Sequence, residues 1–401
     1  MIKIISGLAI ASAFLFSHFA VADDAIAILP RFNTPGFQKT ATSTVEERIL
    51  EGIQQAVSGS SLRLSVYILS HRNVAEALVL ASERGVDVQL VLDGRNQKFE
   101  AGDAIDVLVN GFDGHKGIET CSDMPCIKFC HGPMQFLKIA KGTIGGSCHG
   151  LVINHNKFIL FSELSSGAKN VVMQSSANME EAHLHRYNDL LEVQNDKKLY
   201  EGYLNYWKGL KRDRTRLTSP GDFQGDSGIL VRTSPRLLGK DPVVDLLKRV
   251  SCKLPNSVIR AAESDLGRVG VARQLERLIN EGCSVSILAL DNPTLRQPGK
   301  QVRDALGSSL VLTPAEWDQE KRNSIHTKML LIDASIDGAA EKSKIVLTGS
   351  QNLDLFSLKT NDECQMEIRD PMVYEQYLGF WKRILQDAAT AGFKPFPNDL
   401  N

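Results

Sequence analysis

The chain reads IHTKMLLID at residues 325–333 and NHNKFILFS at residues 154–162. Each stretch places a histidine and a lysine two positions apart at the start of an apolar run. Side chains two apart on a β-strand point to the same face, so the histidine and lysine of each stretch are predicted to face the same way. The apolar residues that follow are typical of a strand in the interior of a sheet.

These two stretches belong to a longer internal repeat with a spacing of about 170 residues. Residues 200–208, YEGYLNYWK, recur as YEQYLGFWK at residues 374–382, with the aromatic and leucine spacing of an amphipathic helix packed on a sheet. A third repeated element lies between the histidine–lysine stretch and the helix in each half: residues 176–178 (SAN) recur as residues 350–352 (SQN). Markers that recur in the same order at matching intervals predict a duplicated chain.

Each half also begins with the same series of elements. The patterns predict a strand, a helix that ends at a capping glycine, and a buried strand: residues 62–69, 74–84 with Gly85 and 86–92 in the first half, and residues 257–262, 271–280 with Gly282 and 283–290 in the second. Such an order predicts right-handed crossovers in an α/β fold. We therefore expect two half-domains, each a mixed, mostly parallel sheet flanked by helices, packed about a pseudo-twofold axis.

The N-terminus has the layout of a cleaved signal peptide. Lys3 precedes an apolar run at residues 4–16, and Ala20-Val21-Ala22 is a small-x-small cleavage site. No later stretch reaches the roughly 20 apolar residues of a membrane-spanning helix. We expect a monomer without a transmembrane anchor, secreted or periplasmic, divided into a signal peptide (1–22), a first half-domain (23–217), a linker (218–228) and a second half-domain (229–401).

The seven cysteines are expected to form disulfides, because exported proteins meet oxidising conditions. Cys252 and Cys283 form one predicted group, and Cys364 is predicted to be buried and unpaired. A second group has four members: Cys121, Cys126, Cys130 and Cys148. The alternative is a zinc site formed by Cys126, Cys130, Cys148 and either His131 or His149, although the spacing matches no standard ligand pattern.

Charge gives little support to sequence-independent nucleic-acid binding, since the formal net charge of the 401 residues is −1. The cationic run at residues 208–216 is expected to be a solvated face, with contact to phospholipid headgroups or nucleic acid as the alternative. His183 and His185 are likewise expected to be solvated.

The two histidine–lysine pairs suit the cleavage of a phosphodiester. One neutral imidazole can attack phosphorus while the other delivers a proton to the leaving alkoxide. Lysines can neutralise charge on the non-bridging oxygens, and further hydrogen bonds to phosphate are expected from Ser176, Asn178, Ser350 and Asn352. The candidate catalytic residues are His155, Lys157, His326 and Lys328, and this chemistry requires neither a cofactor nor a metal.

These motifs resemble the double His-x-Lys-x-x-x-x-Asp signature of the phospholipase D superfamily, with its downstream Gly-Ser-x-Asn element. The second copy matches in full, including Asp333 and residues 349–352, whereas the first has Ser162 in place of the aspartate and Ser175 in place of the glycine. The resemblance implies that Asp333 supports local structure. It also implies a carboxylate that orients each catalytic imidazole, and the repeat offers Asp189 and Glu363 for this role.

The resemblance further implies that His155 is the nucleophile and His326 the general acid. Two fused copies favour a phospholipase D that hydrolyses phosphatidylcholine-like lipids to phosphatidic acid and an alcohol, with transphosphatidylation to other alcohols, at a membrane surface. The first alternative is an exported, metal-independent endonuclease, for which nucleic acid would be the substrate. The second is a catalytically weak protein that binds membrane surfaces.

Overall fold

The computed structural model describes residues 25–35, 44–97, 102–112, 126–133, 138–139, 142–143, 146–314, 324–393 and 396. The predicted signal peptide and Cys121 lie outside these ranges. Among the helices of the described residues, none combines the length and the apolar character needed to cross a membrane.

The first half is a mixed sheet with helices on both faces. Its strand order is β1 (Ala27–Phe32), β10 (Asp189–Gln194), β8 (Lys169–Ser175), β7 (Lys157–Glu163), β2 (Ser61–Val66), β3 (Asp87–Leu92) and β4 (Cys126–Phe129). The helices are α1 (Thr44–Gln55), α2 (Arg72–Glu83), α3 (Gly102–Gly111) and α4 (Lys197–Lys211), with 3₁₀ turns η1 (Gly94–Gln97) and η2 (Glu181–His185). Three two-residue strands lie outside this sheet: β5 (Lys138–Ile139), β6 (Gly142–Thr143) and β9 (Arg186–Tyr187).

The second half repeats this plan. Its sheet has the order β11 (Phe223–Gln224), β12 (Leu230–Ser234), β20 (Glu363–Ile368), β19 (Lys342–Gly349), β18 (Lys328–Ile336), β14 (Val258–Glu263), β15 (Ser284–Leu290) and β16 (Leu310–Thr313), with β13 (Val250–Ser251) beside β18. The helices are α5 (Pro242–Arg249), α6 (Val269–Asn280), α7 (Lys300–Leu306), α8 (Leu355–Lys359) and α9 (Pro371–Thr390), with the 3₁₀ turn η3 (Gly307–Ser309). The predicted linker, residues 218–228, contains β11, which extends this second sheet.

The mixed α/β character and the duplication are confirmed, but the expectation of mostly parallel sheets is wrong. Among the described strands of each main sheet, parallel pairing is confined to β2–β3–β4 and β14–β15–β16, and the other neighbours are antiparallel. The reason is connectivity. β7 leads into β8, and β18 into β19, through short turns, and a short turn can join only antiparallel neighbours.

The predicted crossover elements are present in both halves. Gly85 and Gly282 follow α2 and α6 with φ of +88° and +97°, the left-handed conformation that favours glycine at the end of a helix. The strand before the helix differs from the predicted range at its end. β2 ends at Val66, before the predicted end at residue 69, and β14 ends at Glu263, just after the predicted end at residue 262.

The predicted amphipathic helices α4 and α9 cover one face of their sheets. Trp207 of α4 donates its indole N–H to the backbone oxygen of Leu64 (2.9 Å), and Trp381 of α9 donates to that of Ala261 (3.3 Å). Both indoles are buried in a core that α4 and α9 share with the facing sides of the two sheets. Separate cores lie beneath α1–α3 and beneath α5–α7.

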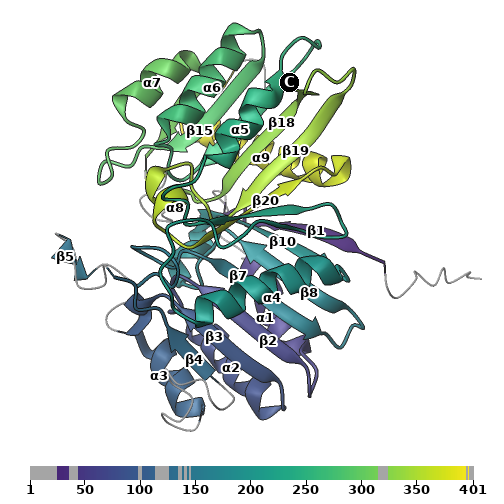
Figure 1. Ribbon diagram of the computed structural model, residues 1–401, viewed down its shortest axis with the longest axis vertical. Coiled ribbons are helices and arrows are strands. Elements are labelled where there is room, and N and C mark those ends of the chain that lie inside the picture. Colours follow the sequence, from purple (N-terminus) through teal and green to yellow (C-terminus); the bar gives the residue numbers. More distant parts are fainter. Residues whose placement is uncertain are drawn as a thin grey trace, which may run out of the picture.

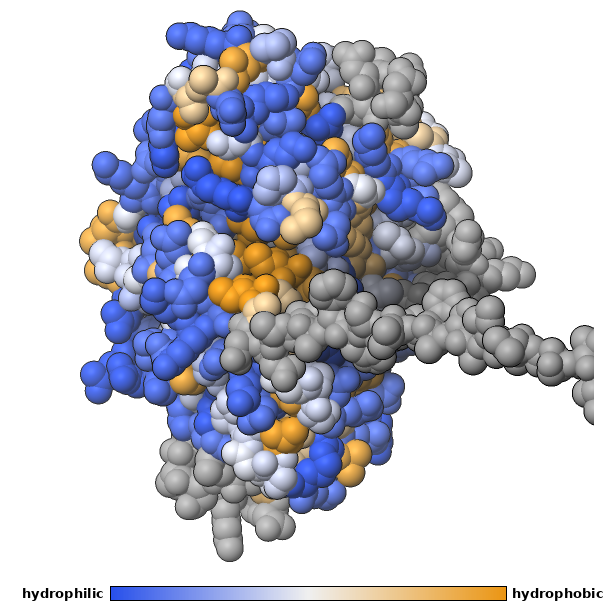
Figure 2. All heavy atoms as spheres, turned by 90° about the vertical axis from the view of Figure 1, so that its right-hand side faces the viewer, coloured by the Kyte–Doolittle hydropathy of each residue, from blue (hydrophilic) through white to orange (hydrophobic). Residues whose placement is uncertain are grey.

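Figure 1 shows the second half above the first, with the two sheets meeting near the middle of the molecule. The parallel pair β9–β17 (Ser324–Ile325) joins one segment of each half at this boundary. On the face that lies at the right of Figure 1, hydrophobic residues gather near the middle and hydrophilic residues dominate elsewhere (Figure 2).

The disulfide expectation is confirmed for the described cysteines. Cys130 is bonded to Cys148 and Cys252 to Cys283, whereas Cys364 is free and buried. Cys126 is also disulfide-bonded. Asp213 lies near Cys130 and Cys148, but the sulfur atoms of these two cysteines are bonded to each other. A disulfide does not fit the zinc alternative, because zinc binds thiolates. These bonds are compatible with export to an oxidising compartment.

Candidate active site

Both histidine–lysine motifs lie where a central strand begins at the boundary between the halves. β7 begins at Lys157 and β18 at Lys328, so each histidine stands just before its strand. The backbone N–H of His155 donates to Asp362 O (3.0 Å), and that of His326 donates to Tyr187 O (3.1 Å). Each motif is thus held by the backbone of the opposite half.

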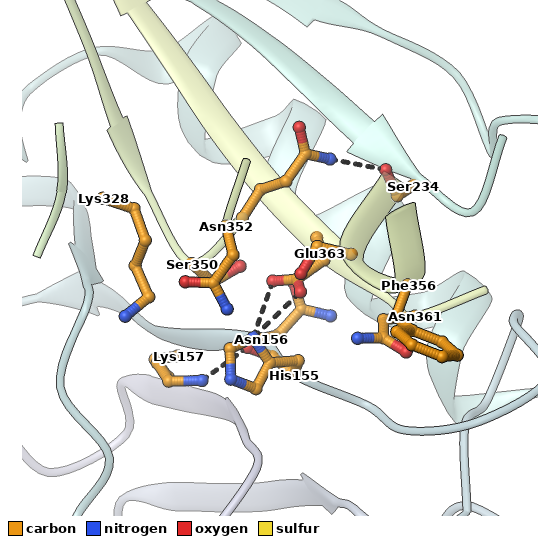
Figure 3. A network of polar contacts seen from close by, with 12 residues as sticks. His155, Asn156, Lys157, Ser234, Lys328, Ser350, Asn352, Phe356, Asn361 and Glu363 are labelled. Atoms are coloured by element: carbon orange, nitrogen blue, oxygen red, sulfur yellow. Dashed lines mark hydrogen bonds and ion pairs between the residues drawn. The ribbon is translucent and has the colours of Figure 1, made fainter. Parts of the chain in front are cut away.

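His155 receives its partner from the other half of the chain. Its Nδ1 lies 2.9 and 3.0 Å from the two carboxylate oxygens of Glu363, which begins β20 and is fully buried (Figure 3). Burial raises the pKa of Glu363 to about 8, against the lowering effect of the Lys157 ammonium. The ionised carboxylate only accepts, so in that state Nδ1 carries the proton and Nε2 keeps its lone pair. The ring of Tyr67 contacts the imidazole edge to face at 5.1 Å. Glu363 thus lies in contact with the imidazole that it is predicted to orient, and that role stays a prediction.

The two lysines point toward the same space as His155. Lys157 Nζ donates to His155 O (2.7 Å) and lies 5.4 Å from the ring centre of Tyr67. Figure 3 shows Lys157 and Lys328 converging with their ammonium groups near His155, with Asn352 between them and Glu363. Both side chains are buried, which concentrates positive charge in a space that excludes most water.

His326 has a different environment from His155. The Nδ1 atom of His326 lies 3.0 Å from the side-chain oxygen of Asn188, which belongs to the first half. Lys328 Nζ donates to the backbone oxygen of His326. The two halves thus exchange partners reciprocally, because Glu363 of the second half contacts His155 of the first and Asn188 of the first contacts His326 of the second.

The structure corrects the expectation that Asp189 orients an imidazole. Its carboxylate accepts hydrogen bonds from Thr327 Oγ1 (2.7 Å), Tyr377 OH (2.9 Å) and the Thr348 hydroxyl. Aspartate is one methylene shorter than glutamate, and these three hydroxyls surround its oxygens. Asn188, the preceding residue, takes the place next to His326.

The expectation that His183 is solvated is wrong. Its ring is buried and packs edge to face on His326, with centroids 4.2 Å apart. The turn η2 folds His183 back so that Asn178 N–H donates to Nδ1 (3.0 Å), while Nε2 lies 2.8 Å from Glu180. Burial is the largest cause that lowers the pKa of His183 to about 4, so this ring is neutral at pH 7.

The residues expected to bind phosphate divide into two kinds. Ser176 and Ser350 are fully buried and bond to the neighbouring strand: Asp189 N–H donates to Ser176 Oγ (2.9 Å), and Cys364 N–H donates to Ser350 Oγ (3.1 Å). Asn178 and Asn352 each keep a carbonyl oxygen without a hydrogen-bond partner in the described part of the chain. The serines therefore hold the strand ends together. A phosphate oxygen would have to accept from the side-chain NH₂ group of an asparagine, because the unpartnered carbonyl oxygen can only accept.

Asp333 lies further along β18, outside the cluster. One carboxylate oxygen accepts from Lys342 Nζ (3.3 Å), a contact with the neighbouring strand β19. At the matching place in the first half, Ser162 Oγ accepts from Ser61 N–H (2.8 Å). Both residues bond to a neighbouring strand, and the structural role implied for Asp333 stays a prediction.

Burial governs the electrostatics of the cluster. It lowers the pKa of His155 and of His326 well below the ordinary value, and in both cases Lys157 and Lys328 lower it further. Each ammonium thus acts on both imidazoles, which marks the four groups as one site. Burial also lowers the pKa of Lys157, and it lowers that of Lys328 to about 8.

The family model described as cardiolipin synthase, PLD-like domain, matches residues 49–210 and 261–385, one segment in each half. The chain therefore belongs to the phospholipase D superfamily, whose members act on phosphodiester bonds.

Solved structures share the fold at low sequence identity. Phosphatidylserine synthase from Haemophilus influenzae has a TM-score of 0.56 at 14% identity, over 93% of this chain and 88% of that one. Polyphosphate kinase from Porphyromonas gingivalis has a TM-score of 0.53 at 13% identity, over 89% of this chain and 50% of that one. This chain thus spans about half the length of the kinase. No curated protein sequence matches the chain.

Proposed function

We propose that this protein is a phospholipase D-type phosphodiesterase that hydrolyses phosphatidylcholine-like phospholipids to phosphatidic acid and a free alcohol. The observation that carries the proposal is the convergence of two imidazoles and two ammonium groups on one buried space, with His155 Nδ1 held by Glu363. The description of the family model, which names a lipid-making enzyme, supports a phospholipid as substrate.

In the first step, His155 Nε2 attacks phosphorus while the bond between phosphorus and the headgroup oxygen breaks. The leaving oxygen takes a proton from the imidazolium form of His326, so the headgroup departs as a neutral alcohol. Burial and the two lysines lower the pKa of His326, and the negative charge of the bound phosphodiester raises it, which favours the imidazolium when substrate is present. Glu363 favours this step, because its carboxylate faces the imidazole ring as that ring gains positive charge. Lys157 and Lys328 neutralise the non-bridging oxygens.

In the second step, His326 removes a proton from water as the water oxygen attacks phosphorus. The bond between phosphorus and His155 breaks, which releases phosphatidic acid and restores both imidazoles. Another alcohol in place of water would give transphosphatidylation by the same route.

The experiment that tests this function incubates the pure protein, in excess EDTA, with short-chain phosphatidylcholine and, separately, with plasmid DNA. We expect release of choline and phosphatidic acid without a divalent ion, because the site supplies positive charge from lysines. Cleavage of DNA without choline release would favour the endonuclease alternative. Turnover that vanishes in EDTA and returns with one divalent ion would refute the phosphohistidine route.

Activity should decline as the pH rises through about 8, because the pKa of Lys328 is lowered to about 8 by burial. Below this pH the ammonium is charged and binds phosphate, and above it the charge is lost. A profile of kcat/KM for a soluble phosphodiester from about pH 6 to about pH 10 measures this effect. In Lys328→Arg the guanidinium stays charged, so the alkaline decline should move upward or disappear. An unchanged decline in Lys328→Arg would assign it to another group.

A further inference from the structure

Two exposed apolar side chains lie at the rim of the site. α8 occupies the short connection between Asn352 and Glu363, so it must lie beside the cluster, and Figure 1 shows it at the edge of the molecule between the two halves. Leu355 and Phe356 of this helix are 57% and 54% exposed. Figure 3 shows Phe356 next to Asn361, whose backbone N–H donates to Phe356 O (3.0 Å).

The other half of the repeat has no such pair. The alignment that matches Asn178 with Asn352 places Glu181 and Ala182, in the turn η2, where the second half has Leu355 and Phe356. Both connections contain one short helical segment, a 3₁₀ turn in the first half and α8 in the second. A short helical segment therefore forms at this place without apolar side chains at the two positions. Their presence in one half only points to a task on that side of the site.

Three further exposed leucines come from segments that surround α8. Arg236 N–H donates to Leu358 O (2.8 Å), which places Leu237 and Leu238 beside the helix, and Leu238 N–H donates to Leu217 O (3.0 Å). Leu238 is 72% exposed and Leu217 49%. We call this group the apolar rim: Leu217, Leu237, Leu238, Leu355 and Phe356. Single exposed apolar residues are common, but a group beside a reaction site marks an interaction surface.

Cationic side chains flank the apolar rim. Arg212, Arg214 and Arg216 are exposed in the segment that leads to Leu217, and Lys240 is exposed after Leu238. Residues 149–151 connect the arginine segment to α8. Arg216 N–H donates to His149 O (2.6 Å), and Leu151 N–H donates to the backbone oxygen of Thr360 (2.7 Å), which directly follows α8. The exposed arginines therefore lie on the same side of the molecule as the apolar rim. Asp213 in this segment accepts from His131 N–H (3.1 Å) and is not exposed.

A basic pocket adjoins Lys240. Its volume is about 200 Å³, and its lining includes Arg232, Arg236, Lys240 and Arg249, with Asp245 as its acidic member. Ion pairs with Glu367, Asp222 and Asp337 offset the charges of the three arginines, so Lys240 contributes most to the positive charge that faces outward. Exposed leucine and phenylalanine side chains beside arginine and lysine complement a bilayer, whose anionic headgroups lie just outside its hydrocarbon.

We propose that the apolar rim and its flanking cations dock the protein onto the surface of a bilayer that contains anionic phospholipid. Leu355 and Phe356 enter the interface and hold the mouth of the site against the headgroup layer. This inference rests on the proposed function, since it gives the site a lipid surface from which to draw its substrate.

Co-sedimentation with vesicles tests the proposal. The probes are vesicles of phosphatidylcholine and phosphatidylglycerol in equal parts, and vesicles of phosphatidylcholine alone. Wild type should bind the anionic vesicles more tightly, and salt should weaken the binding. The double variant Leu355→Ser, Phe356→Ser should partition at least about 30-fold more weakly, because two half-exposed apolar side chains are lost from the interface. Each of Arg212→Gln, Arg214→Gln and Arg216→Gln should weaken binding about five-fold at low salt.

The matched control is Leu80→Ser. Leu80 lies on α2 of the first half and is 54% exposed, like Phe356, so its replacement should leave vesicle binding unchanged. The single variant Phe356→Ser keeps the test open if the double variant fails to fold. Equal binding by wild type and the folded Phe356→Ser variant, no binding by wild type, or binding of plasmid DNA in place of vesicles would each overturn the docking proposal.

Turnover of a monomeric short-chain phospholipid separates this inference from the proposed function. The Leu355→Ser, Phe356→Ser variant should keep wild-type turnover of that substrate and lose turnover of vesicles. Turnover of the monomer without vesicle binding refutes docking alone. Vesicle binding without turnover of any phosphodiester refutes the function alone.

Discussion

His155→Ala should lower kcat for a soluble phosphodiester by at least about 10⁴-fold, and His326→Ala should lower kcat for an alkyl ester to a similar extent. Each imidazole performs a step that the other cannot perform at the same moment, because one is bonded to phosphorus while the other handles the proton. The measurement is steady-state turnover of short-chain phosphatidylcholine. His185→Ala is the matched control, since His185 is half-buried and belongs to neither motif.

A substrate with an acidic leaving group distinguishes the two histidines. A p-nitrophenyl phosphodiester needs no protonation to expel its alcohol, so His326→Ala should still form the phosphohistidine but hydrolyse it slowly. We expect a burst of nitrophenol and a phosphoryl adduct on His155, mapped by mass spectrometry. An adduct on His326 in the His155→Ala variant would reverse the order of roles, and substantial turnover by both alanine variants would refute a shared site.

Glu363→Gln should lower kcat by about 10²- to 10⁴-fold while leaving KM for a soluble substrate nearly unchanged. Glutamine can still accept from Nδ1–H of His155, so the ring keeps its orientation. What is lost is the negative charge that faces the ring when the phosphohistidine forms. The kcat–KM split distinguishes this role from a purely structural one, which would affect folding.

The control for Glu363 is its repeat partner, Asp189. The carboxylate of Asp189 is bonded to hydroxyls and not to an imidazole, so Asp189→Asn should reduce thermal stability more than it reduces kcat. Equal losses of kcat in Glu363→Gln and Asp189→Asn would show that the two carboxylates act alike, against the contacts described above.

The sequence contained enough information for the fold and for the two pairs at its centre. The motif at His326 recurs at His155 in a matching order of elements, and that regularity fixed the duplication, the central strands and the helices α4 and α9. Parallel pairing was overestimated because the local patterns near β2 and β14 report only the crossover strands. The hairpins from β7 to β8 and from β18 to β19 determine the remaining pairs.

The partners of the imidazoles were harder to predict for a physical reason. A repeat aligns backbones, and Asp189 does occupy the same strand position as Glu363, but one methylene decides which side chain reaches a ring in the opposite half. His183 was missed because the 3₁₀ turn that folds it against His326 leaves no periodic signal. For His326, the partner is Asn188, which directly precedes the aligned carboxylate of Asp189. Polar residues adjacent to an aligned position are therefore candidates for the same contact.

The reciprocal exchange of partners between the halves has a consequence for how the site is assembled. His155 and its partner Glu363 are 208 residues apart in the chain, and His326 and Asn188 are 138 residues apart. Either half by itself would therefore hold one imidazole without the side chain that contacts its ring. Under the proposed mechanism, separating the two halves would disable both imidazoles at once.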